Sequence, residues 1–467
     1  MKKIYALFFV LTFIFVGFNA CSDDSEYSQI DTYPIAADDS VSSSLTNAVV
    51  IDVLLNDTAG AIPVATTVSI VGGMDTNSNG SLDKLTVSNE GTWSVNASTG
   101  SITFTPIANF VGNPTAIKYT VKNSQGNSSN EAIVNIISNT IANVPYPKLS
   151  DYNFFVGNIV NQIPFSNVIP YEPASSLFTD YAQKKRFIWM PNGVSATYDG
   201  DDKILDFPIG TFLIKTFYYT TIQPGNVTKL IETRVMVRKS DGWKFYEYLW
   251  NDEQTDAFLV NLEDFANGSF KTITFTKPNN EIVTTDYRIP SDGECFACHK
   301  INDVAIPIAV KPQNLNHNYN YATGSMNQMQ KLVTQGYLNS YPSNIVSTVD
   351  YHDASQPLAL RARSYLDANC AHCHQDQGRC DYRAVRFNFS QTDQDAKVGI
   401  CVTADEEISP TLQKIVSPGN FSKSILHYRI NTNEENQRMP LLGRTIVHEE
   451  GVQLLEQWIT SLNQTCD

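Results

Sequence analysis

The sequence predicts a multidomain protein with an all-β N-terminal sandwich, a β-rich middle domain and a mainly α-helical C-terminal region. Its 467 residues exceed what one hydrophobic core usually organises. From residue 36 to about residue 290, short β-branched or aromatic runs alternate with turn residues, which is typical of strands. After about residue 295, apolar residues recur at three- and four-residue steps, which is typical of amphipathic helices.

The first residues predict an export signal and a lipid anchor. Residues 1–20 combine a basic start with an apolar run, Ile4 to Phe18, that is too short to span a membrane. The stretch Phe18-Asn19-Ala20-Cys21 resembles the lipobox of Gram-negative lipoproteins, in which the cysteine is lipid-modified and becomes the N-terminus. We therefore expect Cys21 to anchor an outer-membrane lipoprotein of the cell envelope, facing the periplasm or the cell surface. The alternative is an ordinary signal peptide that is cleaved nearby and leaves Cys21 as an unmodified free thiol.

The acidic composition argues against nucleic acid as a partner. The chain has 33 Lys and Arg against 48 Asp and Glu, a formal net charge of −15, whereas binding to phosphate backbones needs basic clusters. The charge is compatible with a basic protein partner, but plain solubility is the simpler explanation. Residues 21–33 are rich in Ser and acidic residues with few apolar side chains, so we expect a tether there.

Residues 34–140 are expected to form the sandwich, because period-two alternation is interrupted by turn residues every ten or so positions. This segment resembles a bacterial cadherin-like or immunoglobulin-like repeat of surface proteins. The resemblance implies a spacer or adhesion module. The matching stretches are "IDVLLNDT", "GTWSVNASTGSITFTP" and "YTVKNSQGNSSNEAIV".

A calcium loop is one interpretation of an oxygen-rich stretch within the sandwich. Asp75, Asn77, Asn79 and Asp83 place oxygen side chains at alternate positions around a glycine, as calcium loops do. The twelfth position of such a loop calls for an acidic residue, and Thr86 stands there. The pattern therefore favours a turn rich in Asx residues over a calcium site.

After a proline-containing linker at residues 142–152, residues 150–290 are again expected to be β-rich. Strand candidates include "KKRFIWMPNG", "ILDFPIGTFLIKTFYYTTI" and "LIETRVMVRKSDGWKFYEYLWN". Trp and Tyr are dense here, and a well-packed sheet explains them better than a ligand groove does. From the helical patterns we expect helices in "SMNQMQKLVTQGYL", "LALRARSYLDANCAHC" and "HEEGVQLLEQWITSL".

The pattern Cys-x-x-Cys-His occurs twice and predicts two covalently attached haem c groups in an exported bacterial protein. In each set, two thiols one helical turn apart add to the haem vinyl groups, and the adjacent histidine binds the iron. We expect one haem in residues 291–350 and the other in a domain at residues 355–467. A zinc site, thioredoxin-like pairs and a disulfide within each motif are the alternatives, and they leave the histidines unexplained. The two sets are Cys295, Cys298, His299 and Cys370, Cys373, His374.

The second axial ligands are the next expectation. Met439, in a loop before the terminal helical pattern, is expected to bind the second iron opposite His374, with His427 and His448 as fallback ligands. For the first iron, Met326 is our choice of ligand opposite His299. The alternative is an open sixth position, which would let the iron bind a small ligand. Other candidates at the first iron are His317, Met329, Met190 and Met236.

Three cysteines remain for disulfide chemistry. Export to an oxidising compartment favours one disulfide and one leftover thiol among Cys380, Cys401 and Cys466. We favour Cys401 with Cys466, which would hold the C-terminus onto the domain, over Cys380 with Cys401.

Residues from about 150 to 467 resemble a family of bacterial diheme c-type cytochromes of unestablished role. The resemblance implies two covalent haems, an exported location and a cytochrome c-like C-terminal region, and it supplies no reaction. The stretches that carry it include "PYEPASSLFTDYAQKKRF", "FPIGTFLIKTF", "ETRVMV", "WNDEQTDA", "IPSDGECFACH", "RARSYLDANCAHCH", "PGNFSKSIL" and "RMPLLGR".

The function expected from these features is electron transfer in the cell envelope between a redox protein donor and an acceptor. A haem-dependent oxidoreductase, such as a diheme peroxidase, is the first alternative, and it would need an open iron. A surface adhesion or scaffold lipoprotein is the second. The sequence leaves the oligomeric state open.

Overall fold

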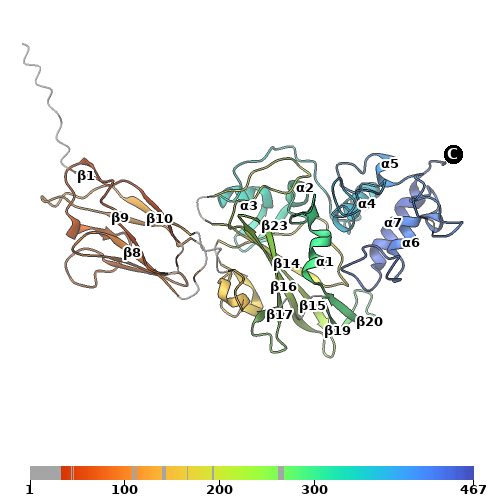
Figure 1. The fold of residues 1–467 in the computed structure, drawn as a ribbon, viewed down its shortest axis with the longest axis horizontal. Coiled ribbons are helices and arrows are strands. Elements are labelled where there is room, and N and C mark those ends of the chain that lie inside the picture. The colour runs from red at the N-terminus through yellow and green to blue at the C-terminus, as the bar shows by residue number, and fades with distance from the viewer. Residues whose placement is uncertain are drawn as a thin grey trace, which may run out of the picture.

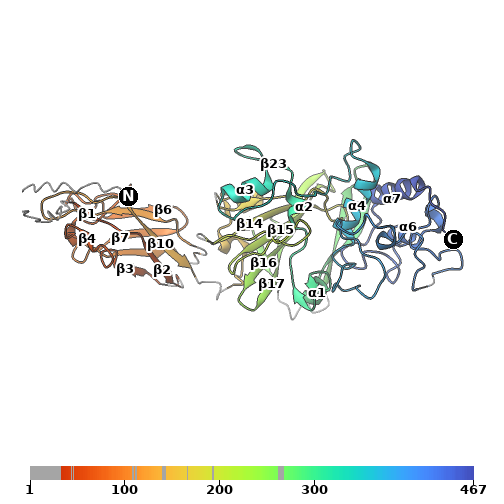
Figure 2. The ribbon, with the colours of Figure 1, turned by 90° about the horizontal axis from the view of Figure 1, so that it is seen from above.

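Three parts of the chain follow one another along the long axis of the computed structural model: a sandwich, a large sheet and a group of helices (Figures 1 and 2). The structure describes residues 33–466 apart from 44, 46, 108–109, 111–112, 139–143, 166, 192–193, 261–267 and 407. The expected signal peptide, the lipid-anchor residue Cys21 and nearly all of the tether lie outside the described residues.

The N-terminal part is a β-sandwich, as the sequence predicts. Two four-stranded sheets, ordered β2-β10-β9-β5 and β3-β8-β7-β6, enclose a core that contains Trp93, Phe104 and Tyr119. A short pair, β1 with β4, lies beside them. The strands are β1 (Pro34–Ile35), β2 (Asp39–Ser43), β3 (Val49–Ile51), β4 (Ala59–Gly60), β5 (Ser69–Ile70), β6 (Lys84–Val87), β7 (Gly91–Val95), β8 (Ile102–Pro106), β9 (Ile117–Thr120) and β10 (Ala132–Ser138). A 3₁₀ turn, η1 (Ala65–Thr67), precedes β5.

A carboxyl pair inside the sandwich makes its stability depend on pH. Burial and the neighbouring Asp57 raise the pKa of Asp39 to about 6, and the Asp39 Oδ2 atom is buried without a hydrogen-bond partner. A folded-state pKa above the unfolded value means that stability is full below about pH 4 and falls as pH rises through 6. We expect the sandwich to unfold at lower urea concentration at pH 7.5 than at pH 5, as measured by pulsed hydrogen exchange of β2 and β9 peptides in the full chain. In Asp39→Asn the difference in urea concentration between the two pH values should shrink. If it stays as large as in the wild type, the Asp39 carboxyl is not its cause.

The middle part is built on one eight-stranded antiparallel sheet. Its strand order is β13-β14-β15-β16-β17-β18, with β19 pairing the end of β15 and also β20. A small pair, β11 with β12, precedes it. The strands are β11 (Phe155–Val156), β12 (Ile163–Pro164), β13 (Ile169–Pro170), β14 (Gln183–Trp189), β15 (Phe212–Ile222), β16 (Val227–Lys239), β17 (Gly242–Trp250), β18 (Ala257–Leu259), β19 (Ser269–Thr276) and β20 (Ile282–Ile289).

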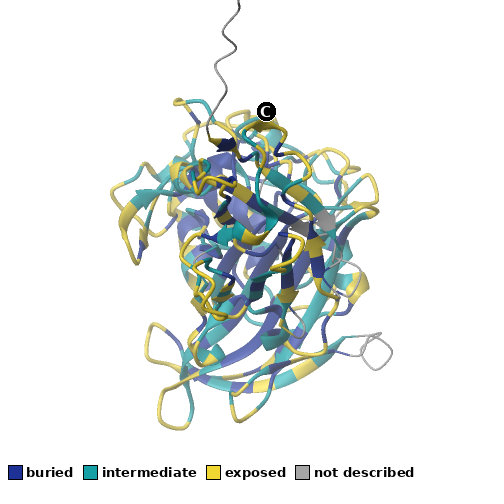
Figure 3. Ribbon diagram, turned by 90° about the vertical axis from the view of Figure 1, so that its left-hand side faces the viewer, coloured by how far each residue is buried: buried dark blue, intermediate teal, exposed yellow. Residues whose placement is uncertain are grey.

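The two faces of this sheet are covered by different segments, because alternate side chains of a strand point to opposite faces. One face packs on the chain that leads into the sheet, including η2 (Leu149–Tyr152) and η3 (Ile159–Asn161). The other face packs on α2 (Pro312–Leu315) and α3 (Gln328–Thr334). The strands are accordingly mostly buried or intermediate, and most of the exposed residues lie in loops (Figure 3). The aromatic residues of this region therefore largely form a packed core, as the sequence indicates.

The chain after the sheet contains short helices and two hairpins. The first helix, α1 (Asp292–Cys298), begins with a capping box, because Ser291 accepts from the Glu294 N–H and Glu294 accepts from the Ser291 N–H. The expected helix around residues 325–338 is shorter than its pattern, because the hairpin of β23 (Asn318–Tyr321) and β24 (Gly324–Asn327) takes up its first residues. The other hairpin pairs β21 (Lys300–Ile301) with β22 (Val304–Ala305).

Helices are the main regular elements of the C-terminal part, but irregular chain connects them over most of its length. The expectation of a mainly α-helical region after about residue 295 is therefore met only in part: long loops surround a small helical core. That core joins the first helix to the last through Leu366, Leu455 and Trp458. A disulfide links Cys401 to Cys466, the pairing favoured from the sequence. The helices are α4 (Leu358–Asn369), α5 (Asp395–Val398), α6 (Ile425–Ile430) and α7 (Glu449–Ser461), with a 3₁₀ turn η4 (Phe421–Lys423).

Candidate functional site

The first Cys-x-x-Cys-His motif lies at the end of α1, beside the sheet. Cys295 and Cys298 belong to the helix and His299 is its C-cap residue. The His299 Nδ1 atom lies 3.0 Å from the carbonyl oxygen of Ile306, which leaves Nε2 for a metal. Burial and the nearby Lys215 lower the pKa of His299 to about 3, so the imidazole is neutral at physiological pH, the form that binds metal ions.

The second motif follows α4. Cys370 is the C-cap residue of that helix, and Cys373 and His374 lie in the turn that comes next. Burial lowers the pKa of His374 to about 4, so this imidazole is neutral as well. Its ring packs edge-on against Phe387, with the ring centroids 5.3 Å apart.

A cavity of about 760 Å³ lies at the second motif. Its wall includes Cys370, Cys373 and His374 of the motif and also Met439, the residue that the sequence predicts as the opposite ligand. The rest of the wall combines apolar side chains with a group of arginines. The apolar residues include Val385, Phe387, Ile415, Leu426, Ile430 and Leu442, and the arginines are Arg288, Arg379, Arg383, Arg429, Arg438 and Arg444.

A smaller cavity, about 140 Å³, lies at the first motif between α1 and the sheet. Cys295, Cys298 and His299 line it together with Met236 of β16. Met326, our sequence-based choice for this iron, does not line it. The β23–β24 hairpin instead places Met326 directly opposite Tyr319 and against the core beside α3.

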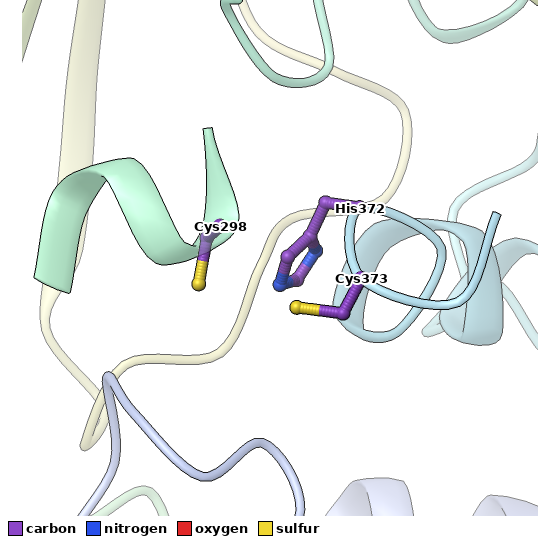
Figure 4. Close-up of side chains that lie close together, drawn as sticks. All are labelled: Cys298, His372 and Cys373. Carbon is purple, nitrogen blue, oxygen red and sulfur yellow. The ribbon is translucent and has the colours of Figure 1, made fainter. Parts of the chain in front are cut away.

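Beside the wall that the two cavities share, the structure brings three side chains together, of which Cys298 and His372 line both cavities and Cys373 lines the larger one. Potential ligand atoms of Cys298, His372 and Cys373 lie within 4.8 Å of one another, and Figure 4 shows Cys298 coming from α1 while the other two follow α4. Sequence reasoning missed His372, although its position between the two cysteines of the second motif was a signal. Its imidazole is buried and its Nδ1 atom has no hydrogen-bond partner among the described residues. Both cavities are lined by Arg288, Glu294, Cys298, His372, Pro440, Leu442 and Gly443.

The two fallback ligands for the second iron, His427 and His448, contact other side chains. His427 lies 2.8 Å from Glu456, and His448 stacks on Phe178 with ring centroids 4.1 Å apart. Neither lines the cavity at the second motif. Of the candidates for the first iron, His317 is half-buried with its Nε2 atom 2.9 Å from the Glu172 carbonyl oxygen, and Met190 and Met329 are fully buried core residues.

The oxygen-rich loop of the sandwich forms a network with its own backbone. The carboxylate of Asp75 accepts hydrogen bonds from the backbone N–H groups of Ser78 and Gly80. Asn77, Asn79 and Asp83 accept from N–H groups of the same loop. These contacts are those of an Asx-rich turn.

The sandwich also shows similarity to a known family. Residues 35–134 match the family model of the surface adhesin CshA repetitive domain. No curated protein matches the chain. The match refines the cadherin-like or immunoglobulin-like resemblance to an adhesin repeat, and it indicates an extracellular or cell-surface protein. Within the described part of the chain, none of the helices is both long and apolar enough to cross a membrane.

Proposed function

We propose that this protein is an exported diheme c-type cytochrome, anchored as a lipoprotein through Cys21, that transfers electrons in the cell envelope between a redox protein donor and an acceptor. The observation that carries the proposal is the pairing of each Cys-x-x-Cys-His motif with a cavity, and the meeting of the two cavities at Cys298 and His372.

The residues present fit haem at both motifs by their chemistry. Each motif offers two thiols and a neutral buried imidazole, the donor set of a c-type haem. The larger cavity lies within the range of about 300–1,000 Å³ that small-molecule and cofactor sites occupy. The cavity at the first motif is smaller than that range, so side chains around α1 would have to move apart to admit a macrocycle.

Zinc is the rival ligand for the junction. Cys298, His372 and Cys373 converge closely enough to bind one metal ion. That arrangement would leave Cys295, Cys370 and both motif histidines without a role, whereas haem attachment uses all of them.

Each residue of the site has a part in this proposal. When bound, each haem would accept and donate one electron at its iron. The cysteines would hold the group covalently, and the Ile306 carbonyl would fix the orientation of the His299 ring. The arginines of the larger cavity would pair with the carboxylate side chains of the haem. Because the cavities share a wall, electrons would pass between the two groups over a short path.

The first test is the haem content of the full-length exported protein. Alkaline pyridine haemochrome should give two covalent haems per chain, and fewer than two would overturn the proposal. Cys380→Ser is a matched control: this thiol also lines the larger cavity but belongs to neither motif, so the variant should keep both haems.

Met439→Ala tests the ligand opposite His374. Met439 lines the cavity of the second motif, and His/Met ligation favours reduced iron and raises the potential. We expect the variant to lose the Met–iron absorption band of the oxidised protein and to lower the potential of one haem, while the haem count stays at two. Met326→Ala is the control and should leave the band unchanged. A band that survives Met439→Ala would refute this ligand.

Surface adhesion is a second candidate function, favoured by the match of residues 35–134 to an adhesin repeat. In this case binding of a surface by the sandwich would be the main function, and electron transfer by the C-terminal part would be secondary to it. Cells that display the full-length chain should then adhere more strongly than cells that display a chain lacking residues 35–134. Equal adhesion would leave the sandwich as a spacer.

A further inference from the structure

A row of three cationic side chains crosses the sheet beneath the first motif. In the antiparallel register, Arg186 of β14 lies directly opposite Lys215 of β15, and Lys215 lies directly opposite Arg234 of β16. The three point to the face that also carries Leu213 and Met236, the face covered by helices. Like charges directly opposite one another destabilise a sheet. Burial together with Arg186 and Arg234 lowers the pKa of Lys215 well below its usual range, and an anion beside the row would relieve this repulsion.

The carboxyl groups of the sheet compensate only one of these cations. Glu232 is fully buried and pairs with Arg234 at 2.6 Å. Glu247, opposite Arg234 in the register, has its pKa raised well above the usual value by burial and by Glu232, so it is held in the neutral form. Glu294, which also lines the cavity, is paired with Arg288 at 2.7 Å.

Arg186 and Lys215 form no ion pair among the residues that the structure describes. The Arg186 Nη2 atom donates to Ser176 Oγ at 2.8 Å, but its Nη1 atom is buried without a hydrogen-bond partner. Arg186 is only 6% exposed, and an unpaired buried donor of a charged group is costly. The Lys215 Nζ atom lies 4.7 Å from the ring centroid of Phe217, and no carboxylate of the described residues forms an ion pair with it.

Both cations open onto the cavity of the first motif. Arg186, Lys215 and Arg234 line it together with Cys295 and His299. Its volume of about 140 Å³ suits a small group of a few atoms. A guanidinium offers a planar pair of donors that matches a carboxylate or another oxyanion, and an ammonium adds a point charge.

We propose that Arg186 and Lys215 bind a carboxylate or a small oxyanion in this cavity. The anion has two sources with the same chemistry. It is either a free anion from solution or a carboxylate side chain of the haem at the first motif. The second source rests on the proposed function; the first does not.

The experiment measures thermal unfolding of the full-length exported protein in a concentration series of phosphate and acetate at constant ionic strength. A ligand that binds the folded state raises the unfolding midpoint in a saturable way. The test variant is Lys215→Met, with Arg186→Gln as a second. Lys185→Met is the matched control, because Lys185 neighbours Arg186 on β14 but bonds to Asn161 on the other face.

If the anion is free, wild type and Lys185→Met should show the saturable rise, and Lys215→Met should bind at least tenfold more weakly. If haem supplies the carboxylate, the wild type should not respond. A Cys295→Ser/Cys298→Ser protein should then gain the response and lose it again when Lys215→Met is added. Where no anion is bound, Lys215→Met should raise the midpoint because a like-charge contact is removed. The background for this comparison is the wild type in anion-free buffer if the anion is free, and the Cys295→Ser/Cys298→Ser protein if haem supplies it.

The proposal is overturned if neither the wild type nor the Cys295→Ser/Cys298→Ser protein responds to added anion. It is also overturned if Lys215→Met responds as the wild type does. Pyridine haemochrome on the same samples separates this outcome from failure of the proposed function, because a protein without haem can still bind phosphate at Arg186 and Lys215.

Discussion

The Cys370→Ser/Cys373→Ser variant should retain one covalent haem per chain in place of two. Serine hydroxyls do not form thioethers, so the second motif loses both of its attachments, while Cys295 and Cys298 still hold the other group. Because Met439 lines only the cavity of the second motif, the Met–iron absorption band should disappear at the same time. Pyridine haemochrome and the intact mass of the protein measure the haem count, and the absorption spectrum of the oxidised protein measures the loss of the band.

The reciprocal variant, Cys295→Ser/Cys298→Ser, is the control for this result. It should also carry one haem, but it should keep the Met–iron band. Zinc at the junction of Cys298, His372 and Cys373 makes a different prediction, because each variant would then remove a ligand of the same single ion. Equal loss of one zinc in both variants, without haem in the wild type, would favour that alternative.

Glu232→Gln should destabilise the middle part by about 3 to 5 kcal/mol, the cost of leaving a buried charge without its partner. Glu232 is completely buried and accepts hydrogen bonds from Arg234 at 2.6 Å and from the Tyr287 hydroxyl at 2.6 Å. The amide is nearly the same size but carries no charge. It would leave Arg234 without the carboxylate that pairs with it, and only ionisation of Glu247, whose pKa is raised by burial and by Glu232, could replace that charge. Urea unfolding of the full chain, followed by pulsed hydrogen exchange of β16 peptides, measures the change.

Two further variants distinguish the charge effect from a packing effect. Glu232→Gln/Arg234→Met removes both members of the pair and should be less destabilised than Glu232→Gln alone. Glu281→Gln removes the exposed partner of Lys277 at the surface and should change stability by less than about 1 kcal/mol. If the double variant is the less stable of the two, loss of packing, not of charge balance, dominates at this position.

Features set by local spacing could be predicted from the sequence. Short stretches of chain determine the residues of both motifs and the helix leading into Cys370, and the alternation along residues 34–140 indicates the sandwich. The structure contains the helix and the sandwich. The pairing of Cys401 with Cys466 could also be predicted, because only three cysteines remained after the lipid and haem assignments.

Features set by strand register or by packing could not be predicted in this way. Arg186, Lys215 and Arg234 look unrelated in the sequence, and only the antiparallel pairing brings them side by side. Met326 was chosen among the candidates that follow His299 in the chain, whereas β16 brings Met236 to the cavity. The C-terminal region shows strong helical patterns in three short segments, and these patterns carry no information on the long loops between them.

The order of the three parts along the molecule has a consequence for which partners can reach the motifs. The sandwich lies at one end and α4 to α7 lie at the other, with the large sheet between them (Figures 1 and 2). A chain held to a bilayer by its N-terminus would therefore project both motifs away from the lipid headgroups by the length of two folded units. Such a stand-off favours encounters with soluble proteins or with material outside the cell over encounters with carriers embedded in the same membrane.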